Sequence, residues 1–181
     1  KRHSVVFKFT GTKETILNSQ VFDPYGKSPF TVASDKKHST VRSSDGTTLA
    51  MIDWDHSNPI MHYQGKKLKC KEWIPWADSK EARILTHAGK DYHWVTRDEI
   101  VYLEPADRSG YHILIWRDPT SQVEVEAFQE CLVVPGLLEA AIIAIVIMQS
   151  GHKLGDHSKG SGNGQFFVNA FAATLGSNIT F

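Results

Sequence analysis

Hydrophobic and polar residues alternate along most of the first 127 residues of this chain. The alternation comes in short runs with the two-residue period of a β-strand that has one buried face. Turn-forming residues separate the runs, as in Asp23-Pro24-Tyr25-Gly26. The pattern predicts eleven strands, at residues 5–9, 21–23, 30–33, 48–54, 60–63, 67–71, 83–86, 91–97, 100–103, 111–116 and 123–127. Because the connections are short, we expect antiparallel meanders and a mainly β fold.

Residues 135–149 show a different pattern, in which no polar face interrupts the apolar side chains. Pro135 suits a first helical turn, Glu139 is the only charge, and Gly151 follows the end. We therefore expect a helix of about fifteen residues, which would span roughly 22 Å. This is short of the roughly 30 Å hydrocarbon core of a membrane. A buried core helix is favoured, and no transmembrane segment is expected. The alternative is a membrane helix, because extension back through residues 132–134 would lengthen the run toward about 18 residues.

A helix that is apolar all round needs apolar neighbours on every side. A sheet of this many short strands can supply them by curling into a closed antiparallel β-barrel around the helix. Closure would also remove the sheet edges that invite aggregation. We expect residues 1–150 to form this barrel with its central helix. Residues 151–181 are expected to be a Gly/Ser-rich linker followed by an apolar C-terminal tail.

Composition and charge change this picture little. The chain has 181 residues, of which 41% are hydrophobic, and this favours one domain. Its 20 basic and 20 acidic residues cancel, so no overall field directs the protein to nucleic acid. Cys70 and Cys131 are the only two cysteines and are far apart in the sequence. This favours free, reduced thiols, with one long-range disulfide as the alternative. With no signal peptide in view, we expect a cytoplasmic protein, free or peripheral to a membrane.

The order of motifs resembles the fungal tubby-like domain family, small basidiomycete proteins related in fold to the tubby and phospholipid scramblase barrels. The resemblance covers roughly residues 5–150 and is carried by "VFDPYGKSPFTVAS" (21–34), "TLAMIDW" (48–54), "KCKEWIP" (69–75), "GKDYHWV" (89–95), "VEVEAF" (123–128) and the apolar helix. It implies a closed barrel of about twelve strands threaded by a C-terminal helix. In tubby-type barrels it also implies phosphoinositide recognition on the outer wall. Members of the family often follow the helix with a basic run, which this chain lacks.

The densest group of basic side chains is Lys66, Lys67, Lys69 and Lys71. Alternation along a strand would place the last three on one face, about 7 Å apart. Such a ridge attracts anionic lipid headgroups or nucleic-acid phosphates. The alternative is a solvated outer face whose lysines protect a sheet edge. A second basic group is formed by residues 36–38.

The nine histidines suggest acid–base chemistry as an alternative. Asp91 and His93 would share one strand face, so the carboxylate could orient the imidazole. His62, His87 and His112 could converge on them if their strands are neighbours. A metal-independent ribonuclease or ribosome-directed toxin would use such groups, whereas solvated or hydrogen-bonded histidines are the structural alternative. No metal, nucleotide or serine-hydrolase motif is present, so no metal and no cofactor are expected.

The five tryptophans could form a stacking platform for sugars or bases, although most are expected in the core. Trp76 follows Pro75, and we expect it in a loop where it could contact a ligand or a membrane interface.

Taken together, the sequence favours a binding module over an enzyme. The first hypothesis is recognition of anionic lipid, phosphoinositide-like, or of a membrane surface through the lysine ridge. The second is the nuclease or toxin, which would have RNA as its partner, and the third is a carbohydrate-binding defence protein. The oligomeric state stays open.

Overall fold

Twelve strands and three helices make up the part of the chain that the computed structural model describes, residues 2–11, 15–117 and 122–154. The strands are β1 (Ser4–Phe9), β2 (Ser19–Phe22), β3 (Phe30–Ser34), β4 (His38–Ser43), β5 (Thr48–Asp53), β6 (Ile60–Tyr63), β7 (Lys66–Lys69), β8 (Ala82–His87), β9 (Lys90–Arg97), β10 (Ile100–Pro105), β11 (Leu114–Arg117) and β12 (Glu124–Phe128). The helices are α1 (Cys70–Trp73), α2 (Gln129–Leu132) and α3 (Leu137–Gln149). The fold is mainly β, as the alternation predicts.

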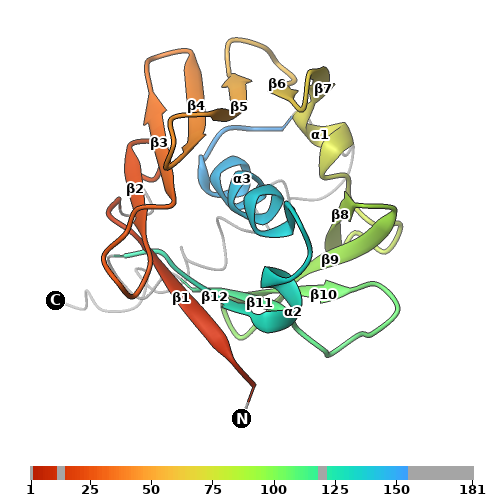
Figure 1. The fold of residues 1–181 in the computed structure, drawn as a ribbon. Coiled ribbons are helices and arrows are strands. Elements are labelled where there is room, and N and C mark those ends of the chain that lie inside the picture. The colour runs from red at the N-terminus through yellow and green to blue at the C-terminus, as the bar shows by residue number, and fades with distance from the viewer. Residues whose placement is uncertain (1, 12–14, 118–121, 155–181) are drawn as a thin grey trace, which may run out of the picture.

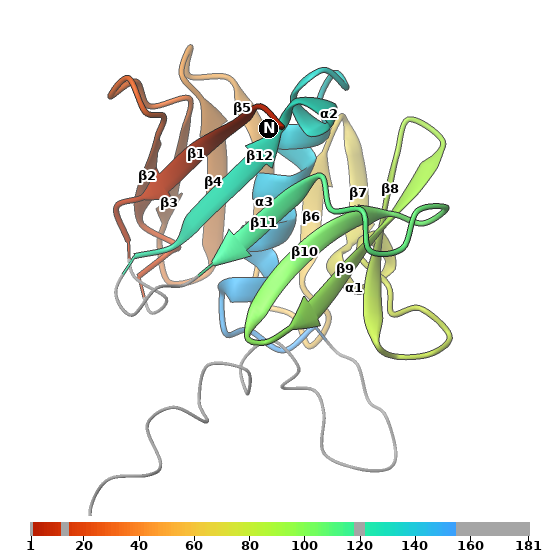
Figure 2. The ribbon, with the colours of Figure 1, turned by 90° about the horizontal axis from the view of Figure 1, so that it is seen from below.

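The strands form a single antiparallel sheet in the order β7-β6-β5-β4-β3-β2-β1-β12-β11-β10-β9-β8. Two meanders therefore meet where β1 pairs with β12, with Ser4 opposite Phe128 and Lys8 opposite Glu124. The sheet curls around α3, which lies in its centre (Figure 1). Seen from below, β12 and β11 cross in front of the helix (Figure 2).

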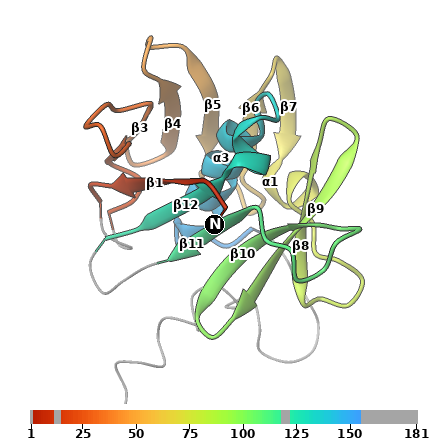
Figure 3. The same cartoon turned by 60° about the horizontal axis from the view of Figure 1, so that its bottom comes forward.

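The predicted closed barrel is wrong, because the ladder begins at β7 and ends at β8 without pairing these two strands. β7 has only four residues, and the chain turns into α1 at Cys70, where we expected the strand to continue. The segment after α1 then occupies part of the edge of β8. Ile84 donates its backbone N–H to Pro75, and Ala77 donates to Ala82. The gap between β7 and β8, which we call the seam, is visible beside α1 in Figures 1 and 3.

Helix α3 fills the space that the sheet encloses. Every residue from Ala140 to Gln149 is buried. The strands face it with the buried half of their alternating residues, including Trp94 and Trp116, whose rings meet edge to face at 6.4 Å. The helix begins at Leu137 rather than residue 135, because Gly136 at its N-cap has a φ of 76°. No helix in the described residues is both long and apolar enough to cross a membrane.

The chain continues along the body of the protein for a few residues after α3. The imidazole of His152 stacks on the Trp54 indole, with ring centroids 4.3 Å apart, and Leu154 is buried. The rest of the predicted linker and the apolar tail lie outside the described residues. Cys70 and Cys131 are both free and buried, so the structure favours the reduced alternative.

Candidate binding site

The hairpin of β6 and β7 forms one side of the seam. Gln64 and Gly65 make its two-residue turn, with φ values of 50° and 72°, the left-handed backbone that a tight hairpin of this kind requires. Tyr63 and Lys66 stand opposite each other on either side of the turn. The next inward pair is Met61 and Leu68, of which Met61 is fully buried. The register therefore turns Lys66 and Leu68 toward the helix, on the same side as Tyr63.

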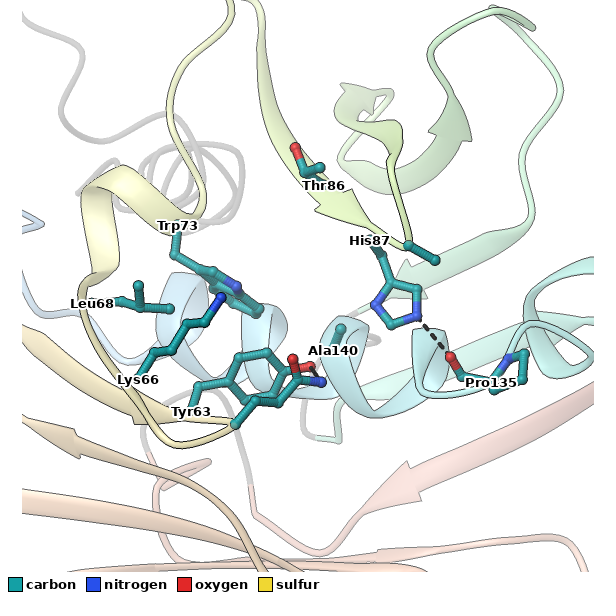
Figure 4. Close-up of a pocket in the computed structure, with 10 residues that line it drawn as sticks. Tyr63, Lys66, Leu68, Trp73, Thr86, His87, Pro135 and Ala140 are labelled. Carbon is teal, nitrogen blue, oxygen red and sulfur yellow. Dashed lines mark hydrogen bonds between the residues drawn. The ribbon is translucent and has the colours of Figure 1, made fainter.

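A cavity of about 480 Å³ lies in the seam over the first turns of α3. Its walls come from both free edges of the sheet and its floor from the helix (Figure 4). The lining residues are Tyr63, Gln64, Lys66, Leu68, Trp73, Thr86, His87, Ala88, Pro135 and Ala140. A second hollow of about 360 Å³ adjoins it and shares Tyr63 and Gln64. These volumes are within the range of small-molecule sites.

Two aromatic rings form the wall on the β6–β7 side. Tyr63 and Trp73 meet edge to face, with centroids 5.4 Å apart and an interplanar angle of 61°. Burial raises the pKa of Tyr63, and the negative charge of Glu139 raises it further. The phenol is therefore neutral at physiological pH, and its oxygen accepts a hydrogen bond from Gln64 Nε2 at 3.2 Å. The wall offers apolar ring surface with a polar rim.

His87 forms the opposite side of the cavity. Its Nε2 lies 2.7 Å from the carbonyl oxygen of Pro135. A carbonyl can only accept, so Nε2 carries a proton and donates it. The other ring nitrogen, Nδ1, lies on the cavity side of the ring (Figure 4). The ring also packs closely on Gly136, where a Cβ atom would lie 3.2 Å from His87 Cε1.

One lysine side chain that lines the cavity, Lys66, has no acidic partner among the described residues. In the described part of the chain, Lys66 has no ion pair, and its side chain extends over the aromatic wall (Figure 4). Glu139 lines the adjoining hollow, close enough to Tyr63 for its charge to raise the pKa of the phenol. The arrangement can accept an anionic group near Lys66 and an apolar group against the rings.

The predicted lysine ridge is only partly assembled. Lys67 and Lys69 point to the outer face of the sheet, as expected, and Lys69 pairs with Glu72 at 2.9 Å. Lys71 lies in α1 and not on the strand, so the strand alternation does not apply to it. Lys66 faces the cavity instead.

Trp76 is half-buried and not a free loop side chain. It forms a β-bridge with Arg83, whose guanidinium lies 4.2 Å from the centre of the Trp76 ring. Arg83 is itself buried and donates to the Ile74 carbonyl. The structure therefore gives Trp76 a role in covering the edge of β8.

The structure does not bring together the four residues predicted for catalysis. Asp91 and His93 share the outer face of β9, but Asp91 accepts from Thr86 Oγ1 at 2.6 Å, and His93 stands opposite Ile84 and Glu104.

The other two predicted histidines lie elsewhere. His62 is on the outer face of β6, opposite Met51 and Lys67. His112 packs between Tyr102 and Phe128, and burial lowers its pKa, with Arg2 acting in the same direction.

A cluster that the sequence does not predict lies where β4 starts and β5 ends. His56 Nε2 is 3.2 Å from Asp53 Oδ2, and His38 lies between Asp35 at 3.4 Å and Asp53 at 3.9 Å. Lys37 pairs with Asp55 at 2.7 Å. Carboxylates therefore offset the second basic group of the sequence. Within the described residues, no group of three or more His, Cys, Asp or Glu is placed to hold a metal ion.

Sequence reasoning overlooked most of the cavity. No sequence motif marks Tyr63, Trp73 or Glu139. They come close together only because the sheet curls around α3. The one local signal is the Gln64-Gly65 pair, because a two-residue turn there would fix the register that sends Lys66 inward.

The comparisons with known proteins leave the function open. No family model matches the chain, and no curated protein matches it. The chain is similar to the X-ray structure of a protein from Arabidopsis thaliana, with a TM-score of 0.40 and 8% sequence identity, over 81% of this chain and 92% of that chain.

Proposed function

We propose that this protein is a binding module for anionic lipid headgroups, and that the headgroup lies at the seam beside β7. The observation that carries the proposal is the position of Lys66, an unpaired cation among the described residues, over a cavity walled by Tyr63 and Trp73. An anionic group near the ammonium and an apolar group against the rings would satisfy both parts of the site.

The outer face of β7 supports the same function. Lys67 and Lys69 are exposed there, on the same strand as Lys66 and Leu68, which line the cavity. A lysine near an anionic membrane surface contributes about 1 kcal/mol to binding. Phosphoinositide recognition by tubby-type barrels, which the family resemblance implies, is a further reason to test lipids first.

A purely structural account of these lysines is that they keep β7 from pairing with another chain. That account explains Lys67 and Lys69, but it gives no role to Lys66, which is also exposed and lines the cavity. The nuclease hypothesis needs histidines that converge, and the predicted ones lie apart. The carbohydrate hypothesis stays a prediction without a site.

Sedimentation with vesicles tests the proposal. The wild-type protein is mixed with vesicles of phosphatidylcholine alone, or with added phosphatidylglycerol or phosphoinositide. We expect binding to the anionic vesicles only. The triple variant K66A/K67A/K69A should bind them about a hundredfold more weakly, from about 1 kcal/mol per lysine.

The matched control is K27A/K36A/K153A, which removes the same charge from exposed lysines away from the seam. It should keep most of the binding. The proposal fails if neither anionic vesicle sediments the wild-type protein, or if the two triple variants lose binding equally. Cleavage of RNA added to the wild-type protein in the presence of a chelator would favour the nuclease hypothesis instead.

A further inference from the structure

Lys66 and His87 face one cavity from the two edge strands, β7 and β8, which do not pair with each other. Lys66 is the first residue of β7, and His87 is the last residue of β8. Both line the cavity, on opposite sides of it (Figure 4). A ligand held by both side chains would join β7 to β8 where no ladder does so.

The hydrogen bond to Pro135 determines which nitrogen of His87 the ligand meets. Nε2 is committed to the Pro135 carbonyl, so the neutral ring presents the lone pair of Nδ1 to the cavity. When the imidazole takes up a second proton, Nδ1 becomes a charged donor that points the same way. The cavity then has a cation on each side.

We propose that the seam cavity binds a phosphate group in its monoester form between Lys66 and protonated His87, and that this binding tightens as the pH falls. The inference rests on the proposed function and specifies its ligand. A terminal phosphate has three free acceptor oxygens, so it can reach donors on two sides at once. The shielded phosphate of a diester has fewer oxygens to offer.

The other charged and titratable groups around His87 determine the net charge that a ligand would meet in the cavity. Lys90 stands opposite His87 on β9, and Asp91 on the same strand is held by Thr86. Tyr63 on β6 is neutral, and Glu139 on α3 lies in the adjoining hollow. Glu139 opposes an anion, which makes the second cation important for binding.

The test compares two lipids at two pH values. Phosphatidylcholine vesicles contain either phosphatidic acid, which has a terminal phosphate, or phosphatidylglycerol, which is a diester. Sedimentation is measured at about pH 6 and about pH 8, on either side of the range in which imidazoles titrate. Phosphatidic acid itself loses charge toward about pH 6, so simple attraction to lysines would weaken there.

We expect the wild-type protein to bind phosphatidic acid about five- to tenfold more tightly at the lower pH, as a charge-assisted hydrogen bond provides. His87→Gln should abolish this increase, because its amide can donate to Pro135 but carries no charge. His3→Gln, on an exposed residue near the N-terminus, should retain the increase. Competition with soluble glycerol 3-phosphate distinguishes the source of the phosphate, since displacement of the protein supports a free ester and its absence supports the lipid.

Equal binding to the two lipids at both pH values would overturn the inference and leave the proposed function standing. A pH response that persists in His87→Gln would overturn it as well. Failure of the wild-type protein to bind either vesicle would overturn both. Circular dichroism of each variant shows that a change in binding is not a loss of fold.

Discussion

His87 Nε2 lies 2.7 Å from the carbonyl oxygen of Pro135, although 48 residues separate them in the chain. This hydrogen bond joins the free end of β8 to the loop that precedes α3. The sheet has no ladder at the seam, so side-chain contacts have to hold its edges to the helix there. The bond fixes the N-terminal end of α3 against one of these edges.

Loss of this bond should lower stability. We expect His87→Ala to reduce the free energy of unfolding by about 1 kcal/mol, the net contribution of one hydrogen bond. His87→Gln should retain most of that stability, because its amide can still donate. Urea unfolding measures both variants, and an equal loss in the two would contradict the assigned bond.

Gly136 combines a left-handed backbone with close contact to His87. Its φ is 76°, and an added Cβ would lie 3.2 Å from His87 Cε1. Gly26 has a φ of 74° with nothing near its position. We expect Gly26→Ala to lower the free energy of unfolding by about 1 kcal/mol through backbone strain alone. Gly136→Ala should lower it by about 1 kcal/mol more, and thermal unfolding of the two variants compares them directly.

Local pattern predicts most of the elements of this fold. Eleven of the twelve strands have an expected run at or next to their positions, and the apolar run at residues 135–149 predicts α3 to within two residues at its start. The pattern predicts no strand at residues 38–43, where the structure has β4. Ser39 occupies an inward position there and accepts a hydrogen bond from Trp54 Nε1 at 2.7 Å. A polar residue on the buried face conceals the alternation, and its partner cannot be known from the sequence.

The seam could not be predicted, because closure of a sheet depends on what covers its last strands. The alternating pattern shows which face of a strand is buried, but it does not show which strand edges are left unpaired. The β8 edge is covered by residues Pro75 to Ala77, and only tertiary contacts such as Ile84 N–H to Pro75 show this. The same limit applies to the site. Residue spacing gives the faces of Lys67 and Lys69, but it does not show that Lys66 and His87 line the same cavity.

Glu104 should make stability depend on pH at the acid end. Its side chain is 2% exposed, accepts from Arg97 Nη2 at 2.9 Å and from the Gly110 N–H at 2.8 Å. The hydrogen bond from Arg97 lowers the pKa of Glu104, the Gly110 bond acts in the same direction, and burial opposes them. A carboxyl whose pKa is lower in the folded state stabilises the protein above its unfolded pKa. That stability is lost as the pH falls through the folded pKa.

We therefore expect Glu104→Gln to lower the free energy of unfolding by about 1 to 2 kcal/mol at neutral pH. The difference from the wild type should shrink below about pH 4. Asp55→Asn breaks an exposed pair with Lys37 and should change stability by less than about 1 kcal/mol at any pH. A difference between wild type and Glu104→Gln that stays constant down to acid pH would refute the assignment.

The two thiols should be unreactive in the folded protein. Burial raises the pKa of Cys70 and of Cys131 to about 12, and both side chains are fully buried. Thiolate is the reactive form, so a disulfide reagent should label neither thiol until urea unfolds the chain. Ser44→Cys places a thiol in an exposed turn and should be labelled at once. Rapid labelling of Cys70 without denaturant would mean that the region around α1 opens in the native state.

A cylinder of fully paired strands has a circumference set by its strand number and shear. The sheet of this protein is open between β7 and β8. Its circumference could therefore increase at the seam without breaking the hydrogen bonds between any paired strands. Enlarging Ala140, which faces the seam, should therefore be absorbed with little loss of stability. The same enlargement at Ala144, which is fully buried and does not line the cavity, should lower stability more, because overpacking a filled core causes strain.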